Sequence, residues 1–83
     1  MPDDYIGASL EIYPNPVSTE LNIKTTNGNV SRVTIVDVLG QIVYRQIFAS
    51  SALSIDVSAF VPGIYVLEAE TASGIITRKF IRE

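Results

Sequence analysis

Few residues of this chain could take part in chemistry. Glu68 and Glu70 lie two apart in a segment of alternating polarity, so both side chains point to the same side of an expected strand. Such a pair can act as acid and base or bind calcium, but no third ligand or glycine-rich loop is nearby, which favours a solvated strand face. We interpret Asp37 as a turn residue that bonds the backbone two positions on, and Asp56 as an exposed strand residue.

The side chains that most often perform catalysis are missing. The sequence has no histidine and no cysteine, which removes the usual general base near neutral pH, disulfides and thiolate metal sites. Serines are frequent, but none stands in a nucleophile-elbow pattern. We therefore predict a protein that is not an enzyme, with no catalytic residues, no cofactor and no metal ligands.

Chain length and net charge exclude further classes of protein. The 83 residues allow one domain, and the net charge of −3 leaves no basic groove for nucleic acid. No apolar run approaches the ~20 residues of a transmembrane segment. The acidic start Met1-Pro2-Asp3-Asp4 does not resemble a signal peptide, and we expect the chain to be part of a longer protein.

The elements around these residues follow a period of two, interrupted by turn signals every 8–12 residues. This pattern predicts an all-β fold, a seven-stranded immunoglobulin-like antiparallel β-sandwich without the usual cystine and tryptophan. The expected strands lie around 10–12, 21–23, 32–38, 42–48, 53–57, 65–69 and 75–81. We expect residues 1–8 to be a linker or an addition to the native sequence, and residues 9–83 to be the domain.

Three connections and two strands have features of their own. The segment 32–38 is more continuously apolar, which predicts a central strand buried on both faces. Asp37 and Gly40 mark a type I turn, and residues 49–52 a small polar loop. Residues 59–63 are expected to cross between the sheets. In the segment 75–81 neither register has a clean apolar face, so its inward side stays open.

The predicted core consists of the inward members of these strands, with one aromatic residue from the crossover. It comprises Leu21, Ile23, Val33, Ile35, Ile55, Leu67 and Phe60. Tyr65 follows Pro-Gly at the start of a strand, where sandwiches place a tyrosine whose hydroxyl bonds upstream backbone. The basic residues Arg78, Lys79 and Arg82 are either a recognition tag or charges that protect an edge strand.

Taken in order, several of these pieces resemble a known family. They are Tyr13-Pro14-Asn15-Pro16, Leu21 with Ile23, Asp37 with Gly40, Ile55-Asp56-Val57-Ser58, Pro62-Gly63-Ile64-Tyr65, and Gly74 with Lys79 near the end. The chain from about Leu10 to Glu83 thereby resembles the type A C-terminal sorting domain of the bacterial type IX secretion system, the Por secretion tail family.

The resemblance implies a function and a set of partners. Such domains follow an exported cargo protein, carry it through the periplasm to the type IX outer-membrane translocon, and are usually removed by a sortase-like peptidase at the cell surface. The expected location is therefore the cell surface or the medium. The residues that match the family's closing motifs, and are expected to carry the sorting signal, are Pro62, Gly63, Tyr65, Gly74, Lys79, Phe80 and Ile81.

An alternative is an immunoglobulin-like accessory or carbohydrate-binding module of a secreted enzyme. A sugar-binding module needs aromatic rings on one exposed face. The four tyrosines fall in different expected strands, and Tyr65 is expected to point inward.

Overall fold

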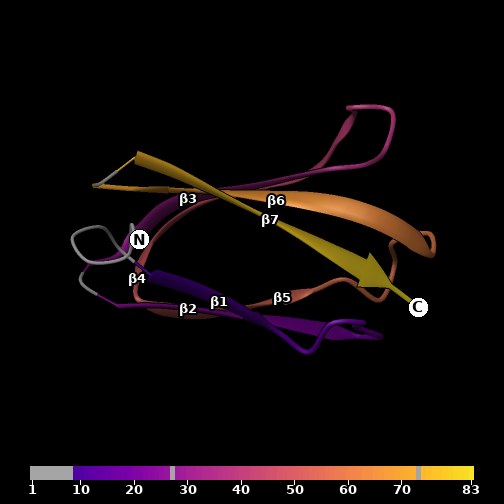
Figure 1. Ribbon diagram of the computed structural model, residues 1–83, viewed down its shortest axis with the longest axis horizontal. Coiled ribbons are helices and arrows are strands. Elements are labelled where there is room, and N and C mark those ends of the chain that lie inside the picture. Colours follow the sequence, from indigo (N-terminus) through magenta and orange to yellow (C-terminus); the bar gives the residue numbers. More distant parts are fainter. Residues whose placement is uncertain (1–8, 27, 73) are drawn as a thin grey trace, which may run out of the picture.

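The fold is an antiparallel β-sandwich. The structure is a computed structural model that describes residues 9–26, 28–72 and 74–83. Within these ranges it has no helix and seven strands: β1 (Ser9–Tyr13), β2 (Glu20–Thr26), β3 (Val30–Val36), β4 (Ile42–Ser50), β5 (Ala52–Asp56), β6 (Gly63–Thr71) and β7 (Gly74–Arg82). One sheet has the order β1-β2-β5 and the other β4-β3-β6-β7, and Figure 1 shows them as two facing layers. The predicted all-β class is confirmed.

The alternating residues bury one face of each sheet. In β2, Leu21 and Ile23 are fully buried between more exposed neighbours, and in β6 Leu67 and Ala69 are buried in the same way. Successive side chains of a strand point to opposite faces, so these positions meet between the two layers. No buried side-chain nitrogen or oxygen in the described ranges lacks a hydrogen-bond partner.

The strand order is that of an immunoglobulin-like sandwich with the fourth strand in the larger sheet. β4 pairs with β3, and is not part of the β1-β2-β5 sheet that the fourth strand joins in antibody constant domains. The chain then passes directly from β4 to β5, with only Ser51 between them. The predicted loop over residues 49–52 was therefore wrong. Backbone pairing continues through this segment, because Ser50 pairs with Val30, Ala52 pairs with Lys24, and the Thr25 N–H donates to the Ser51 carbonyl at 2.9 Å. The Ser50 Oγ also donates to the Ala52 carbonyl at 2.7 Å.

The central strand β3 begins and ends two residues earlier than predicted. It ends at Val36, and its outward side is only partly buried, although Thr34 there is buried. Asp37 turns the chain: its Oδ1 accepts the N–H of Leu39 at 2.9 Å, and its carbonyl accepts Gly40 N–H at 3.0 Å. The predicted role of Asp37 is confirmed, while Val38 lies exposed in the turn and not in the strand.

Six of the seven predicted core residues are buried, and Phe60 is the exception. It is only partly buried and packs on the rim of the core, with its ring 5.3 Å from that of Tyr65. The fully buried aromatic residue is Phe80 from the last strand. The crossover that holds Phe60 joins β5 to β6 and runs over the surface, which explains why its ring reaches the core from one side only.

The opening turn is attached to the end of the chain. The Tyr13–Pro14 and Asn15–Pro16 peptide bonds are both cis. The buried Val17 follows this turn and lies beside Arg82, with which it forms a parallel β-bridge. The C-terminus lies at the end of the molecule opposite the β6–β7 turn (Figure 1). The expected linker over residues 1–8 lies outside the described residues.

Candidate functional site

The β6–β7 hairpin brings most of the predicted sorting-signal residues to one end of the molecule. Its register places Tyr65 opposite Phe80 and Gly63 opposite Arg82. Pro62 directly precedes Gly63 and is therefore at the same end. Gly74 is paired with Thr71 at the other end of the hairpin, so it does not join the group.

Tyr65 and Phe80 form the buried framework of this end. The Tyr65 hydroxyl donates a hydrogen bond to the Val61 carbonyl, four residues upstream, and its ring stacks on Phe80 with centroids 5.6 Å apart. The predicted structural role of Tyr65 is confirmed. Because Phe80 is fully buried, a binding partner cannot touch it on the folded domain.

The two glycines are required by backbone conformation and not by space. Gly63 has a φ of 157° and Gly74 a φ of 122°, and no heavy atom lies within 4 Å of where either Cβ would stand. Residues with a side chain rarely adopt a φ such as that of Gly74. Both glycines therefore begin strands whose course a side chain would strain.

The accessible residues of the site lie on the outer side of the larger sheet. Ile64 and Ile81 are direct cross-strand partners, 46% and 44% exposed, and Val66 is the partner of the exposed Lys79. These four residues alternate with the inward-pointing Tyr65 and Phe80, so they share the outer face. We refer to Ile64, Val66, Lys79 and Ile81 as the outer-face patch.

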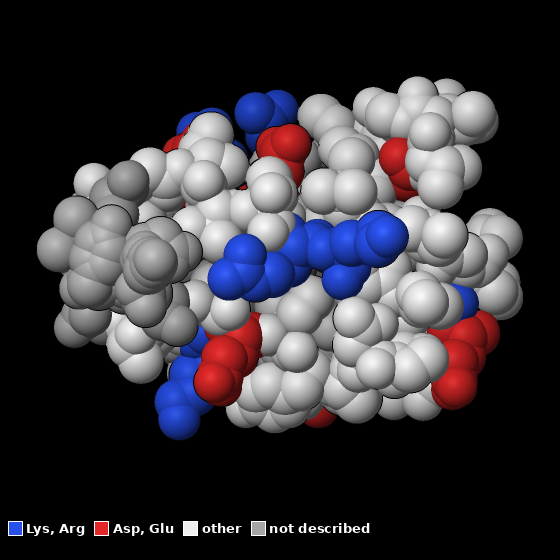
Figure 2. Space-filling model, viewed as in Figure 1, with Lys and Arg blue, Asp and Glu red and all other residues white. Residues whose placement is uncertain are grey.

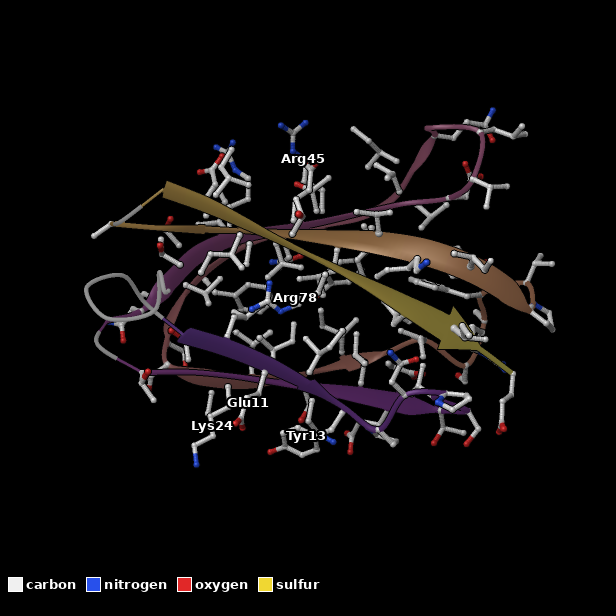
Figure 3. The ribbon with its side chains drawn as sticks, viewed as in Figure 1. Glu11, Tyr13, Lys24, Arg45 and Arg78 are labelled. Atoms are coloured by element: carbon white, nitrogen blue, oxygen red, sulfur yellow. The ribbon has the colours of Figure 1, made fainter. Side chains whose placement is uncertain are left out.

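The three basic residues of the last strand have different environments. Arg82 is half-buried, and its guanidinium donates to the Val57 and Ser58 carbonyls at 2.8 Å each, which ties β7 to the crossover. Arg78 is opposite Leu67 on the inward side, yet it is exposed because β7 is an edge strand. A basic band crosses the middle of the face in Figure 2, at the place where Figure 3 labels Arg78 between the two layers.

Lys79 is the cation of this strand with the most freedom to meet a partner. Its side chain is exposed, and within the ranges that the structure describes the ammonium has no ion-pair partner. The sequence of residues 75–81 did not show which face of this strand points inward. The structure gives the reason, because Arg78, at the rim of the sandwich, lies on the same inward face as Phe80 and Ile76.

The open edge of β7 is already occupied near the C-terminus. Asn15 Nδ2 donates to the Lys79 carbonyl at 3.3 Å, and Asn15 Oδ1 accepts the Ile81 N–H at 2.9 Å. The Val17 N–H then donates to the Ile81 carbonyl at 2.8 Å, and the Glu83 N–H donates to the Val17 carbonyl at 2.9 Å. These four bonds leave the end of β7 no free edge for an added strand.

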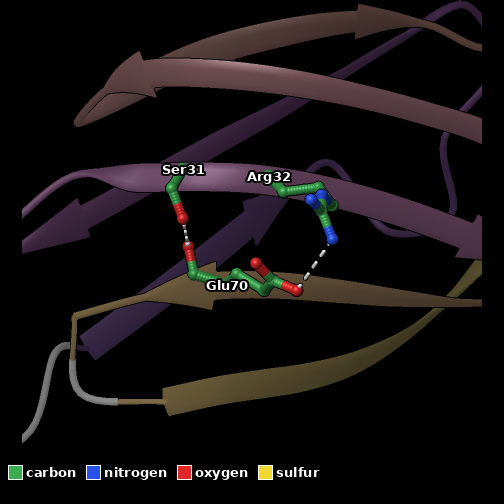
Figure 4. A network of polar contacts seen from close by, with 3 residues as sticks. All are labelled: Ser31, Arg32 and Glu70. Atoms are coloured by element: carbon green, nitrogen blue, oxygen red, sulfur yellow. Dashed lines mark hydrogen bonds and ion pairs between the residues drawn. The ribbon is translucent and has the colours of Figure 1, made fainter.

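Three of the four carboxylates considered for chemistry, Asp37, Asp56 and Glu70, have hydrogen-bond partners. Glu70 accepts from the Arg32 guanidinium at 3.3 Å, and its carbonyl accepts from Ser31 Oγ at 3.1 Å (Figure 4). In the part of the chain that the structure describes, no three Asp or Glu side chains gather in a way that could hold a metal ion. Hydrogen bonds from the Ser58 hydroxyl and then from its backbone N–H, both to Oδ1, lower the pKa of Asp56.

The described tyrosines do not form a platform for sugars. Tyr13 is exposed on β1, where Figure 3 labels it on the far side of the smaller sheet, whereas Tyr65 is buried between the sheets. Tyr44 is half-buried on β4, and burial raises the pKa of its phenol. The three rings therefore do not share one exposed face. A shallow hollow of about 340 Å³ is lined by Arg32, Arg45, Gln46 and Ile47 and by none of these tyrosines.

Comparison with known families identifies the class of this domain. The model of the family described as secretion system C-terminal sorting domain matches residues 11–83, which is most of the chain. The chain belongs to this family, the C-terminal sorting domains of type IX secretion. No protein of curated function matches the sequence significantly. In the described ranges, no helix is long and apolar enough to cross a membrane.

Sequence reasoning missed the residues that attach the two ends of the domain to each other. Asn15 belongs to the predicted turn over residues 13–16 and Val17 follows it, and neither is part of an alternating segment that would indicate burial or pairing. Ile64 could have been noticed, since it is an apolar residue at an outward position of a strand. Part of the outer-face patch could thus have been predicted from the sequence. The hydrogen bonds that attach β7 to the opening turn could not.

Proposed function

We propose that this domain is the sorting signal of an exported cargo protein, recognised by the type IX translocon and usually removed by a sortase-like peptidase. The proposal places the cargo upstream of residues 9–83 and its destination at the cell surface or beyond. The domain itself carries out no reaction in this scheme. The lack of histidine and cysteine in the sequence supports a role in binding.

Membership in the sorting-domain family carries the proposal, and the outer-face patch supplies a surface for recognition. Ile64, Val66 and Ile81 offer apolar area, and Lys79 offers a charge whose ammonium is not engaged by a described acidic group. Exposed apolar residues around a charged one are typical of protein-binding surfaces. In this proposal Lys79, Ile81 and Pro62 are available to the partner, whereas Gly63, Tyr65, Gly74 and Phe80 hold them in place.

The bonds at the edge of β7 favour recognition through side chains. Strand addition needs free N–H and C=O groups, and Asn15 and Val17 use those of Lys79 and Ile81. The outer face of the same residues has no such cover within the described ranges, as the exposure of Lys79 and Ile81 indicates.

An export assay tests this function. Residues 9–83 are fused behind a signal peptide and a fluorescent cargo in cells with a type IX system, and the cargo is measured in the medium, on the surface and in the periplasm. We expect the cargo to cross the outer membrane, and to stall in the periplasm of a translocon-deficient strain. Lys79→Ala should lower export, while its effect on stability should be within about 0.5 kcal/mol, since an exposed lysine contributes little to folding.

The chain contains a matched control for this variant. Lys24 is the only other lysine and is exposed on β2 in the opposite sheet, where Figure 3 labels it near Glu11. Lys24→Ala should leave export unchanged. Cargo retained in wild-type cells by a folded domain would refute the sorting function, and equal effects of the two lysine variants would refute the outer-face patch.

A further inference from the structure

Asn15 lies at the start of the domain but bonds the strand at its end. Its side-chain amide contacts the backbone of two residues of β7 that are 64 and 66 positions later in the chain. Most asparagines in turns bond backbone within a few residues of themselves. This contact therefore has a different role from the usual turn-forming bond.

The amide of Asn15 takes the place of a neighbouring strand. In an antiparallel pair, the backbone groups of alternate residues face the same neighbour. Lys79 and Ile81 direct their free backbone groups away from β6, and Asn15 supplies an acceptor for the N–H of Ile81 and a donor for the carbonyl of Lys79. Val17 continues the pairing with Ile81 and Glu83. The side chain thus completes a short third strand beside β7.

Without the hydrogen bonds from Asn15, the last residues of β7 would have few restraints on the edge that faces away from β6. The ends of chains are poorly ordered unless they are tied down. The buried Phe80 fixes one point of the strand, and Arg82 fixes another through Val57 and Ser58. Asn15 bonds the two residues that bear exposed side chains of the outer-face patch, Lys79 and Ile81.

We propose that Asn15 is a positioning residue that closes the free edge of β7 and thereby sets the arrangement of Lys79 and Ile81 for recognition. The inference rests on the proposed sorting function. It adds that the translocon reads the C-terminal strand with the opening turn attached to it. A residue at the boundary with the cargo therefore controls the signal at the other end of the domain.

Hydrogen exchange on the isolated domain tests the contact without any export. In Asn15→Ala the Ile81 amide loses its acceptor, and its exchange should accelerate about three- to tenfold relative to the wild type. The Phe80 amide, which faces β6, should change less. Asn15→Asp keeps an acceptor for Ile81 and should retain much of the protection. Asn29→Ala is the matched control, because this exposed asparagine precedes Val30, which pairs with Thr71 at the β6–β7 turn, away from the C-terminus.

Export separates positioning from general stability. Ile55→Val lowers stability from the core side of β5, a strand of the other sheet that does not pair with β7, and the fusion with this variant is compared with Asn15→Ala at similar melting temperatures. We expect Asn15→Ala to reduce export at least about threefold more than Ile55→Val, with partial rescue by Asn15→Asp.

Each failure has a separate meaning. Unchanged exchange at Ile81 in Asn15→Ala would refute the edge closure, and equal export of Asn15→Ala and Ile55→Val would refute the positioning role. Retention of the wild-type fusion would instead refute the sorting function itself, and the exchange experiment would still decide whether Asn15 closes the edge. If Asn15→Ala does not fold, Asn15→Ser provides the same comparison.

Discussion

Short polar side chains bond the backbone of this domain at three places where a strand ladder stops. Asp37 accepts the N–H groups of Leu39 and Gln41, Asp56 accepts that of Ser58, and Asn15 accepts that of Ile81. These hydrogen bonds are exposed, and a typical hydrogen bond contributes about 0.5–1.5 kcal/mol, which is still a sizeable part of the stability of a small domain. Asp37 and Asp56, which were considered as candidates for chemistry in the sequence, therefore stabilise the backbone.

Tyr65 shows how a single hydroxyl can be tested. Tyr65→Phe removes the donor to the Val61 carbonyl and keeps the ring between Phe60 and Phe80, so it should cost about 0.5–1.5 kcal/mol of unfolding free energy. Urea titration followed by fluorescence or circular dichroism measures the change. Tyr13→Phe, at an exposed tyrosine, should cost close to nothing. A Tyr65→Phe variant as stable as the wild type would show that the hydroxyl bond does not contribute.

At the scale of elements, period-two alternation predicted the strands well where each strand has one solvent-exposed face and one buried face. β2, β5 and β6 alternate in this way, and their inward residues were identified correctly. The pattern failed in β7, because an edge strand brings its inward Arg78 to the rim, where water reaches it. It also failed between β4 and β5, where small polar residues indicated a loop but continue the backbone pairing.

The crossover after β5 should make stability depend on pH. The folded pKa of Asp56 lies below the unfolded one, because Ser58 donates two hydrogen bonds to the ionised carboxylate. The stabilisation is therefore complete above the unfolded pKa of about 4 and disappears as the pH falls through the lower folded value.

Ser58→Ala removes the stronger of these two contributions. Its loss of stability relative to the wild type should be largest at neutral pH and should shrink as the pH falls below about 4. Ser50→Ala also removes a hydroxyl bond, but to a backbone carbonyl, so its effect should not vary with pH. Thermal unfolding from pH 7 to pH 2.5 measures both. A constant difference for Ser58→Ala over this range would contradict the assignment.

At the scale of the molecule, the domain is closed by contacts between its first and last segments. Val17 pairs with Arg82 and Asn15 with Lys79 and Ile81, and these contacts join residues more than 60 positions apart. Long-range pairs of this kind leave no local pattern in the sequence, since no alternation or turn rule relates the two segments. The predicted sorting-signal residues came from family resemblance. Tyr65 was already expected to point inward, but only the structure distinguishes the buried Phe80 from the exposed Lys79 and Ile81.

This closure changes how a C-terminal deletion must be interpreted. Removing residues 79–83 takes away Lys79 and Ile81, but also the fully buried Phe80 and the bonds of Arg82 to the crossover. Loss of a buried phenylalanine alone costs about 3–5 kcal/mol, and the whole domain should have only about 4–12 kcal/mol. We therefore expect the deletion to abolish cooperative unfolding and not merely to remove a tag.

Circular dichroism and urea unfolding of the truncated domain test this expectation against two substitutions that keep the strand. Lys79→Ala and Ile81→Ser should retain a cooperative transition close to that of the wild type, because both side chains are exposed. Export lost in these folded variants would report on recognition, whereas export lost in the deletion would report on folding. A truncated domain that unfolds cooperatively near the wild-type midpoint would contradict this expectation. It would show that the part of β7 from Lys79 onward, with its contacts to the first segment of the domain, contributes little to stability.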